Sequence, residues 1–254
     1  MSFLVKICGL STPEALDAAL DAGADMVGFV FFAPSPRNLG LGVARELGER
    51  VRGRARKVAL TVDASDDELA RIVEALAPDM LQLHGRETTD RVVTVRTRFG
   101  LPVMKALPIA RRADLSPIYG YAEVADWLLF DARAPRAASR PGGLGRPFDW
   151  RLLENLDPSL SFMLSGGLDA GNVAEALRIT RAPGVDVSSG VERALGEKDP
   201  VKIRAFIQAA RAATAALGPM GPRNPPPKYF APEDLGSQNN TPKDLGQKKN
   251  AGTV

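Results

Sequence analysis

The stretch Val5-Lys6-Ile7-Cys8-Gly9-Leu10 contains the only cysteine of this 254-residue chain and has the pattern of a short, buried β-strand. Two β-branched residues precede the cysteine, and a glycine suited to a turn follows it. Ser11 and Glu14 then have the spacing of a capping box, so we expect a helix to begin directly after the turn. The stretch therefore predicts one β/α unit with a thiol at the carboxyl end of its strand.

The same alternation of a short apolar segment and a helical pattern continues along the chain. A helix is expected after each segment, and the last one is expected over about residues 199–217. Several segments are apolar on both faces, which is typical of strands that are buried on both sides. The expected strands are Leu4–Cys8, Met26–Phe31, Lys57–Val62, Met80–Leu83, Pro102–Ala106, Trp127–Asp131, Ser161–Ser165 and Val185–Ser188.

Alternating strands and helices of this length predict an α/β fold with a parallel sheet. Eight β/α units close into a (β/α)8 TIM barrel at about 200–250 residues, and residues 1–217 fit the compact end of that range. The alternative is an open, doubly wound sheet, which usually begins with a Gly-x-Gly-x-x-Gly turn after the first strand. The first turn here offers only Gly9. We therefore predict a single-domain TIM barrel.

Residues 218–254 differ in composition from the predicted barrel. Seven of the 20 prolines fall in this segment, and runs such as Gln238-Asn239-Asn240 cannot fill a core, so we expect a disordered tail. The segment holds five of the 33 basic residues and three of the 30 acidic ones, which leaves 28 basic against 27 acidic residues in 1–217. A domain so close to neutral has no field that would attract nucleic acid.

The expected compartment follows from the cysteine count and from the apolar runs. A single cysteine excludes an internal disulfide, and the first residues lack the basic segment and apolar run of a signal peptide. Charged residues interrupt every apolar run before about 18 residues, which argues against a membrane-spanning helix. We therefore expect a cytoplasmic protein with no membrane partner.

Two glycine-containing turns follow the seventh and eighth expected strands, where TIM barrels often hold a phosphate. They are Ser165-Gly166-Gly167 and Ser188-Ser189-Gly190, and the second leads into Val191-Glu192-Arg193, where we expect a short extra helix. Glycines let backbone N–H groups approach an anion closely. In the alternative interpretation these glycines only make turns, but their matching positions in the barrel favour a phosphate site.

Cys8 and Asp131 end the first and sixth expected strands, so they are expected to face each other across the mouth of the barrel. A thiolate can act as a general base and a carboxylic acid as a general acid. Ionisation of the thiol near neutral pH needs nearby positive charge, for which Lys6 and Arg37 are candidates. In the alternative, Cys8 is a buried hydrophobe and Asp131 caps a helix or forms a salt bridge.

Two further polar residues follow expected strands. Arg37 carries forked donors that suit a substrate carboxylate, although it is equally compatible with a solvated loop. His84 is the only histidine and has no cysteine or acidic residue at metal-ligand spacing, so we expect no metal site. We expect His84 to support the loop after the fourth strand.

A series of short motifs runs in order along about residues 4 to 212. The motifs are Lys6-Ile7-Cys8-Gly9, Gly28-Phe29-Val30-Phe31 with Ser35-Pro36-Arg37, Leu81-Gln82-Leu83-His84-Gly85, Leu129-Phe130-Asp131, Gly142-Gly143-Leu144-Gly145 with Phe148-Asp149-Trp150, Ser165-Gly166-Gly167-Leu168 and Gly184-Val185-Asp186-Val187-Ser188-Ser189-Gly190-Val191-Glu192. This ordered set resembles the phosphoribosylanthranilate isomerase family. The resemblance implies a TIM-barrel enzyme of tryptophan biosynthesis, with a small phosphorylated substrate. The implied reaction is the Amadori rearrangement of N-(5′-phosphoribosyl)anthranilate to 1-(2-carboxyphenylamino)-1-deoxyribulose 5-phosphate.

The resemblance also implies roles for individual residues. Asp131 would protonate the ribose ring oxygen, and Cys8, as a thiolate, would remove the proton from C2′. Arg37 would hold the anthranilate carboxylate, and Asp186 would lie near the sugar or the amine. The phosphate would be held by backbone amides of Gly166, Gly167, Ser189 and Gly190. No metal or organic cofactor is needed, and we expect a monomer or a homodimer.

Two rival functions share parts of this pattern. The histidine-pathway phosphoribosyl isomerase has the same fold but resembles a two-aspartate design, with an aspartate in place of Cys8. A catalytically silent subunit that binds a phosphorylated metabolite would keep the glycine turns and lose the acid–base pair. Two stretches depart from the family pattern: Val58–Asp63, where the family more often has a strand rich in Gly and Phe, and Gly142-Gly143-Leu144-Gly145, where leucine replaces a small hydroxyl residue.

Overall fold

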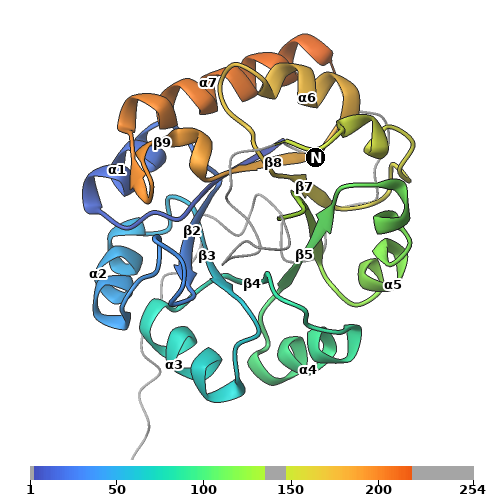
Figure 1. The fold of residues 1–254 in the computed structure, drawn as a ribbon. Coiled ribbons are helices and arrows are strands. Elements are labelled where there is room, and N and C mark those ends of the chain that lie inside the picture. The colour runs from blue at the N-terminus through green and yellow to red at the C-terminus, as the bar shows by residue number, and fades with distance from the viewer. Residues whose placement is uncertain (1–2, 135–146, 219–254) are drawn as a thin grey trace, which may run out of the picture.

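Eight parallel strands close into a barrel surrounded by helices in the computed structural model, which describes residues 3–134 and 147–218 (Figure 1). The final strand pairs in parallel with the first and so closes the sheet. The strands are β1 (Leu4–Cys8), β2 (Met26–Phe31), β3 (Arg56–Thr61), β4 (Met80–Leu83), β5 (Val103–Ile109), β6 (Trp127–Ala132), β7 (Phe162–Leu164) and β8 (Gly184–Val187). The predicted TIM barrel is confirmed. Of the tail predicted over residues 218–254 only Gly218 is described, and the motif at 142–145 lies outside the described residues.

The strand boundaries differ from the sequence expectations by only a few residues. β1, β2 and β4 begin and end where they are expected. β5 continues to Ile109 because it pairs with β6 along its full length, up to the pair Ile109 and Ala132. β3 ends at Thr61, one residue before its expected end.

Helices follow most of the strands and cover the outside of the barrel (Figure 1). They are α1 (Pro13–Asp21), α2 (Leu41–Val51), α3 (Asp66–Leu76), α4 (Thr89–Phe99), α5 (Ile118–Ala122), α6 (Val173–Thr180) and α7 (Pro200–Leu217). The described residues between β6 and β7 form only one 3₁₀ turn, η2 (Trp150–Leu153), where a helix was expected. Within 3–134 and 147–218, none of the helices combines the length and the apolar character that membrane spanning requires.

The first helix begins one residue later than the capping pattern predicts. Thr12 is the N-cap, and its side chain accepts a hydrogen bond from the Ala15 N–H at 3.3 Å. The expected capping box at Ser11 is therefore wrong. Proline prefers the first helical position, where its missing N–H costs nothing, so Pro13 shifts the cap onto Thr12. α7 begins as expected, with Asp199 as its N-cap.

The interior of the barrel is apolar at one end and polar at the other. A cluster rich in methionine fills the end of the barrel at which the strands start. It comprises Met26, Val58, Met80, Met104, Ala106, Trp127, Leu129 and Met163. Lys6 and Cys8 lie at alternate positions of β1 and so point to the same face, which is the interior. Both are buried, with exposed fractions of 0% and 3%. The carboxyl ends of the strands therefore carry the chemistry.

Candidate active site

A pocket of about 650 Å³, its open mouth included, lies at the carboxyl ends of the barrel strands. The polar residues that line it are Cys8, Ser35, Arg37, His84, Asp131, Ser165, Asp186, Ser188 and Ser189, together with Gly166 and Gly167. All the residues expected at the site except Gly190 thus line one cavity. A thiol on β1 and a carboxyl group on β6 can exchange protons with two positions of a ligand bound between them.

The thiol of Cys8 is held in a narrow, largely apolar space. Val30 and Leu60 pack around it in the same cluster. A β-carbon on Gly28 of the neighbouring strand would come within 2.9 Å of Cys8 Sγ, so only glycine leaves room for the thiol there. Burial raises the pKa of the Cys8 thiol, and the positive charges of Lys6 and Lys198 oppose that rise without cancelling it. Lys6 is thus one of the expected sources of positive charge, and burial is the stronger influence on the thiol.

A chain of three polar groups lies beside Cys8. Lys6 Nζ donates to Asp186 Oδ1 at 2.8 Å, and Ser165 Oγ donates to Asp186 Oδ2 at 3.1 Å. Burial lowers the pKa of Lys6, but Asp186 and Cys8 outweigh this effect, so the net pKa lies above its ordinary value. Lys6 is therefore a fixed positive charge between Asp186 and the thiol.

Asp131 is bonded to the only histidine of the chain. His84 Nε2 lies 3.2 Å from Asp131 Oδ2, and the Ala132 N–H donates to Asp131 Oδ1 at 2.8 Å. The Gln82 amide nitrogen lies 3.0 Å from His84 Nδ1 and donates to it, so the neutral ring carries its proton on Nε2 and donates it to Asp131. His84, expected only to support a loop, thus lines the pocket beside Asp131.

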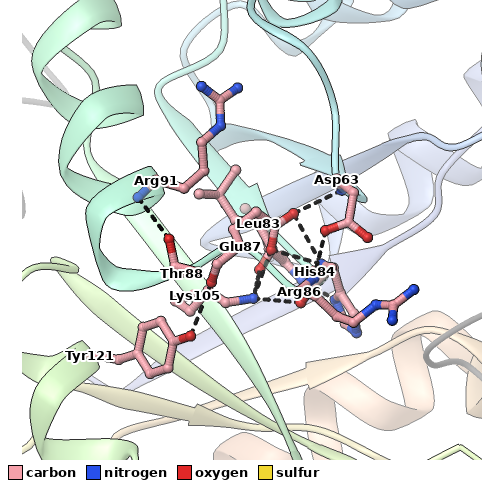
Figure 2. A network of polar contacts seen from close by, with 11 residues as sticks. Asp63, Leu83, His84, Arg86, Glu87, Thr88, Arg91, Lys105 and Tyr121 are labelled. Atoms are coloured by element: carbon pink, nitrogen blue, oxygen red, sulfur yellow. Dashed lines mark hydrogen bonds and ion pairs between the residues drawn. The ribbon is translucent and has the colours of Figure 1, made fainter.

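The segment that carries His84 is fixed by a buried network below it (Figure 2). Lys105 Nζ donates to Glu87 Oε2 at 2.8 Å, to the Gly85 carbonyl at 2.8 Å and to the Leu83 carbonyl at 3.2 Å. Glu87 Oε1 in turn accepts from the N–H groups of Asp63 at 2.9 Å and Gly85 at 3.1 Å. The ion pair therefore ties the residues on both sides of His84 to β5 and to Asp63, which follows β3.

Arg37 is buried and paired, which excludes the solvated-loop alternative. Its exposed fraction is 3%. Arg37 Nε donates to Glu192 Oε1 at 2.6 Å, and Nη2 donates to Oε2 at 2.9 Å. Lys198 Nζ also donates to Glu192 Oε1, at 2.8 Å. Burial lowers the pKa of Lys198 to about 8, although Glu192 opposes this effect. Neither Glu192 nor Lys198 was expected at the site.

Glu192 and Lys198 come from a small two-stranded ribbon that the sequence did not predict. β9 (Glu192–Ala194) pairs antiparallel with β10 (Glu197–Lys198). The short helix expected at 191–193 is wrong, because the helical turn η3 ends at Val191 and the chain then enters β9. Gly196 makes the reversal possible with a φ of +83°. The ribbon returns Lys198 to the turn that follows β8.

The two glycine turns meet at the mouth of the pocket. Gly166 and Gly167 have φ values of +88° and +67°, which favour glycine, and among the described residues their N–H groups have no acceptor. Gly190 does not line the pocket. Its Cα packs against the carbonyl of Leu168, where any β-carbon would collide, so Gly190 lets the two turns approach each other.

The part of the chain that the structure describes contains no group of three or more histidine, cysteine, aspartate or glutamate side chains arranged to hold a metal ion.

Comparison with known proteins identifies the family. The model of the family described as N-(5′-phosphoribosyl)anthranilate isomerase matches residues 5–209. The N-(5′-phosphoribosyl)anthranilate isomerase of Bradyrhizobium diazoefficiens is 68% identical over 212 residues, which cover 84% of this chain and 95% of that protein.

Solved structures agree with this assignment. The phosphoribosylanthranilate isomerase of Thermotoga maritima has a TM-score of 0.75 and 31% identity, and the match covers 84% of this chain and 100% of that one. A phosphoribosylanthranilate isomerase in complex with reduced 1-(o-carboxyphenylamino)-1-deoxyribulose 5-phosphate has a TM-score of 0.73 and 30% identity, with the same coverage of both chains. The chain belongs to the N-(5′-phosphoribosyl)anthranilate isomerase family.

Proposed function

We propose that this isomerase of tryptophan biosynthesis uses Asp131 as its general acid and Cys8 as its general base. The reaction is the intramolecular rearrangement of N-(5′-phosphoribosyl)anthranilate to 1-(2-carboxyphenylamino)-1-deoxyribulose 5-phosphate. The observation that supports these roles is that both side chains line one pocket from facing strands, β1 and β6. Each has a polar partner: Lys6 lies beside Cys8, and His84 Nε2 lies 3.2 Å from Asp131 Oδ2.

The proposed steps move protons without any redox partner. Asp131 gives a proton to the ribose ring oxygen while the bond from that oxygen to C1′ breaks, which leaves a Schiff base at C1′. The Cys8 thiolate then takes the proton from C2′, and the electron pair of that C–H bond forms an enolamine. Tautomerisation protonates C1′ and removes the proton of the C2′ hydroxyl, which gives the ketone. The substrate gains and loses the same number of protons, and no cofactor is required.

The raised pKa of the thiol has a consequence for this mechanism. Only the thiolate can accept the C2′ proton, and burial disfavours the thiolate. Lys6 and Lys198 are the positive charges that favour it. We therefore expect kcat/KM to rise as the pH is raised from neutrality, because a larger fraction of Cys8 is then ionised.

The remaining expected residues would bind the substrate at its two charged ends. Arg37 would hold the anthranilate carboxylate, with Glu192 fixing the orientation of its guanidinium group. The backbone amides of Gly166, Gly167, Ser189 and Gly190 would hold the phosphate. Asp186, bonded to Lys6 and Ser165, would contact the sugar or the amine.

We further propose that residues 1–217 form the catalytic domain and that this domain acts in the cytoplasm on a small phosphorylated substrate, with neither nucleic acid nor a membrane as a partner. The oligomeric state is proposed to be a monomer or a homodimer. A Thermotoga maritima relative is described as dimeric, which supports the second form.

Genetic complementation tests the proposed function. Expression of the chain is expected to rescue tryptophan-requiring cells that lack this isomerase, and Cys8→Ala serves as the matched control that does not. Rescue of a histidine-requiring strain alone would favour the histidine-pathway isomerase. If a chain that is expressed and folded rescues neither strain, the silent phosphate-binding subunit becomes the better interpretation.

A further inference from the structure

Lys198 is a buried lysine that does not line the pocket but is bonded to one of its walls. The side chain of Lys198 has an exposed fraction of 1%. Its ammonium group donates to the Ser188 carbonyl at 2.8 Å, to Ser188 Oγ at 3.1 Å and to Glu192 Oε1 at 2.8 Å. These three acceptors use all three donors of the ammonium group. Two of the three bonds go to Ser188, the first residue of the turn after β8.

The bond from Lys198 to the Ser188 carbonyl, which also accepts from the Val191 N–H at 3.4 Å, helps to fix where the next amide points. The carbonyl of Ser188 and the N–H of Ser189 belong to one planar peptide unit, and in a trans peptide they point in opposite directions. None of the described peptide bonds is cis. With the carbonyl fixed on Lys198 behind the turn, the Ser189 N–H is directed away from Lys198. Ser189 lines the pocket, whereas Lys198 does not.

We propose that Lys198 is a positioning residue for the substrate phosphate, and that it acts by holding the Ser188 carbonyl so that the Ser189 N–H faces the pocket. Lys198 does not touch the phosphate in this arrangement. The proposal rests on the proposed function, because it takes the turn after β8 to be one wall of the phosphate site.

The turn after β7 has a corresponding device. Asn172 Nδ2 donates to the Gly167 carbonyl at 2.8 Å, and Asn172 Oδ1 accepts from the Asp169 N–H at 2.9 Å. Like Lys198, Asn172 does not line the pocket. Each turn is therefore held from behind by one side chain that donates to a backbone carbonyl. Such a pattern suits turns whose amides must keep a fixed direction.

The charge of Lys198 supports this role. Glu192 is the common acceptor of Arg37 and Lys198, so the buried cluster holds two positive groups and one negative group. Arg37 lines the pocket, so Lys198 is the positive group of this cluster that lies behind the turn and favours an anion in front of it. The ammonium form can donate three hydrogen bonds, whereas a neutral amine can donate only two.

The test compares Lys198→Met with Lys202→Met. Lys202 Nζ donates to the backbone carbonyl of Glu192 at 2.7 Å, so its loss perturbs the same ribbon without a bond to the turn. For each variant, kcat, KM and the Ki of inorganic phosphate as a competitive inhibitor are measured. Because the charged donor is lost, we expect KM and the phosphate Ki of Lys198→Met to rise together by about tenfold or more, with a smaller change in kcat. Lys202→Met is expected to match the wild type in both.

Several results would overturn the proposal. If Lys198→Met lowers the melting temperature but leaves the phosphate Ki unchanged, the lysine serves stability alone. A fall in kcat with unchanged KM would assign it to the chemical step instead. Should Lys198→Met fail to fold, Lys198→Gln keeps a side-chain NH2 donor group but is too short to reach both Ser188 oxygens, so a wild-type phosphate Ki in that variant contradicts the proposal. If the wild type neither turns over the substrate nor is inhibited by phosphate, the proposed function itself fails.

Discussion

Two of the three buried lysine–carboxylate pairs among the described residues, those of Lys6 and Lys105, have almost the same distance and burial but lie on different strands. Lys6 and Asp186 are 2.8 Å apart, with side-chain exposures of 0% and 5%. Lys105 and Glu87 are also 2.8 Å apart, with exposures of 2% and 3%. Burial of this kind costs several kcal/mol per ion unless each charge is well paired. Each pair is therefore expected to have a role that offsets the cost of burying its charges.

The difference between the pairs lies in what surrounds them. Asp186 lines the pocket, and Lys6 acts on the thiol of Cys8, so the first pair sets the charge at a reacting group. The second pair lines no part of the pocket and is bonded to the backbone of the segment that carries His84 (Figure 2). The Lys6–Asp186 pair thus influences the ionisation of the Cys8 thiol, whereas the Lys105–Glu87 pair fixes the backbone beside His84.

The largest effects are expected when the reacting groups themselves are removed. Cys8→Ala and Asp131→Ala are each expected to lower kcat by about 10²–10⁴, the usual worth of a general acid or base, while the substrate still binds. Steady-state kinetics on phosphoribosylanthranilate and an inhibition constant for a product analogue would measure both effects. Wild-type turnover by Cys8→Ala would show that the base is another group.

Breaking the second pair tests the geometric role. Lys105→Met leaves Glu87 charged and without its cation in a buried site, which typically costs about 3–5 kcal/mol of unfolding free energy. Urea denaturation measures this loss. Arg98→Met is the matched control, because Arg98 forms an ion pair with Asp66 at the surface and no change is expected. Equal stability of Lys105→Met and the wild type would contradict the assignment.

Breaking the first pair tests the electrostatic role. The Lys6 charge favours the thiolate, so Lys6→Met is expected to raise the pKa of Cys8 further, and the unpaired Asp186 acts in the same direction. The rise of kcat/KM with pH should therefore shift to higher pH in Lys6→Met. In Lys105→Met the pH at the midpoint of the kcat/KM rise should be the same as in the wild type. A shift of similar size in both variants would remove the distinction between the two pairs.

The sequence predicts the barrel well because strand and helix patterns are local. Lys6 and Cys8 are two residues apart on one strand, so their shared face also follows from the sequence alone. Glu192 and Arg37 are separated by 155 residues, and Lys105 and Glu87 by 18, so their pairing depends on how distant units meet in the closed barrel. The ribbon that carries Lys198 was missed because its two strands have three and two residues, too few to give an alternating pattern.

The catalytic assignments depended on resemblance more than on physics. A lone cysteine and an aspartate at strand ends are compatible with packing and capping roles, and only the ordered motifs favoured chemistry. The sequence did not predict a place for His84 in the site, because a single histidine without neighbouring ligands gives no signal for a metal site. Its bond to Asp131 joins residues 47 positions apart and could be found only from the fold.

The smallest expected effect concerns His84, which lies in the segment fixed by the Lys105–Glu87 pair and contacts the reacting group Asp131. His84→Ala removes the hydrogen bond that orients Asp131 and is expected to lower kcat by up to about tenfold, since a hydrogen bond is worth about 0.5–1.5 kcal/mol. His84→Gln places an amide N–H near the position of Nε2 and should recover most of that loss. Both variants remove the imidazole ring, but only glutamine restores an N–H donor. Recovery by glutamine therefore indicates that His84 positions Asp131 through this hydrogen bond and does not act merely by filling space. If glutamine and alanine are equally slow, the ring itself is needed, and proton exchange between His84 and Asp131 replaces positioning as the explanation.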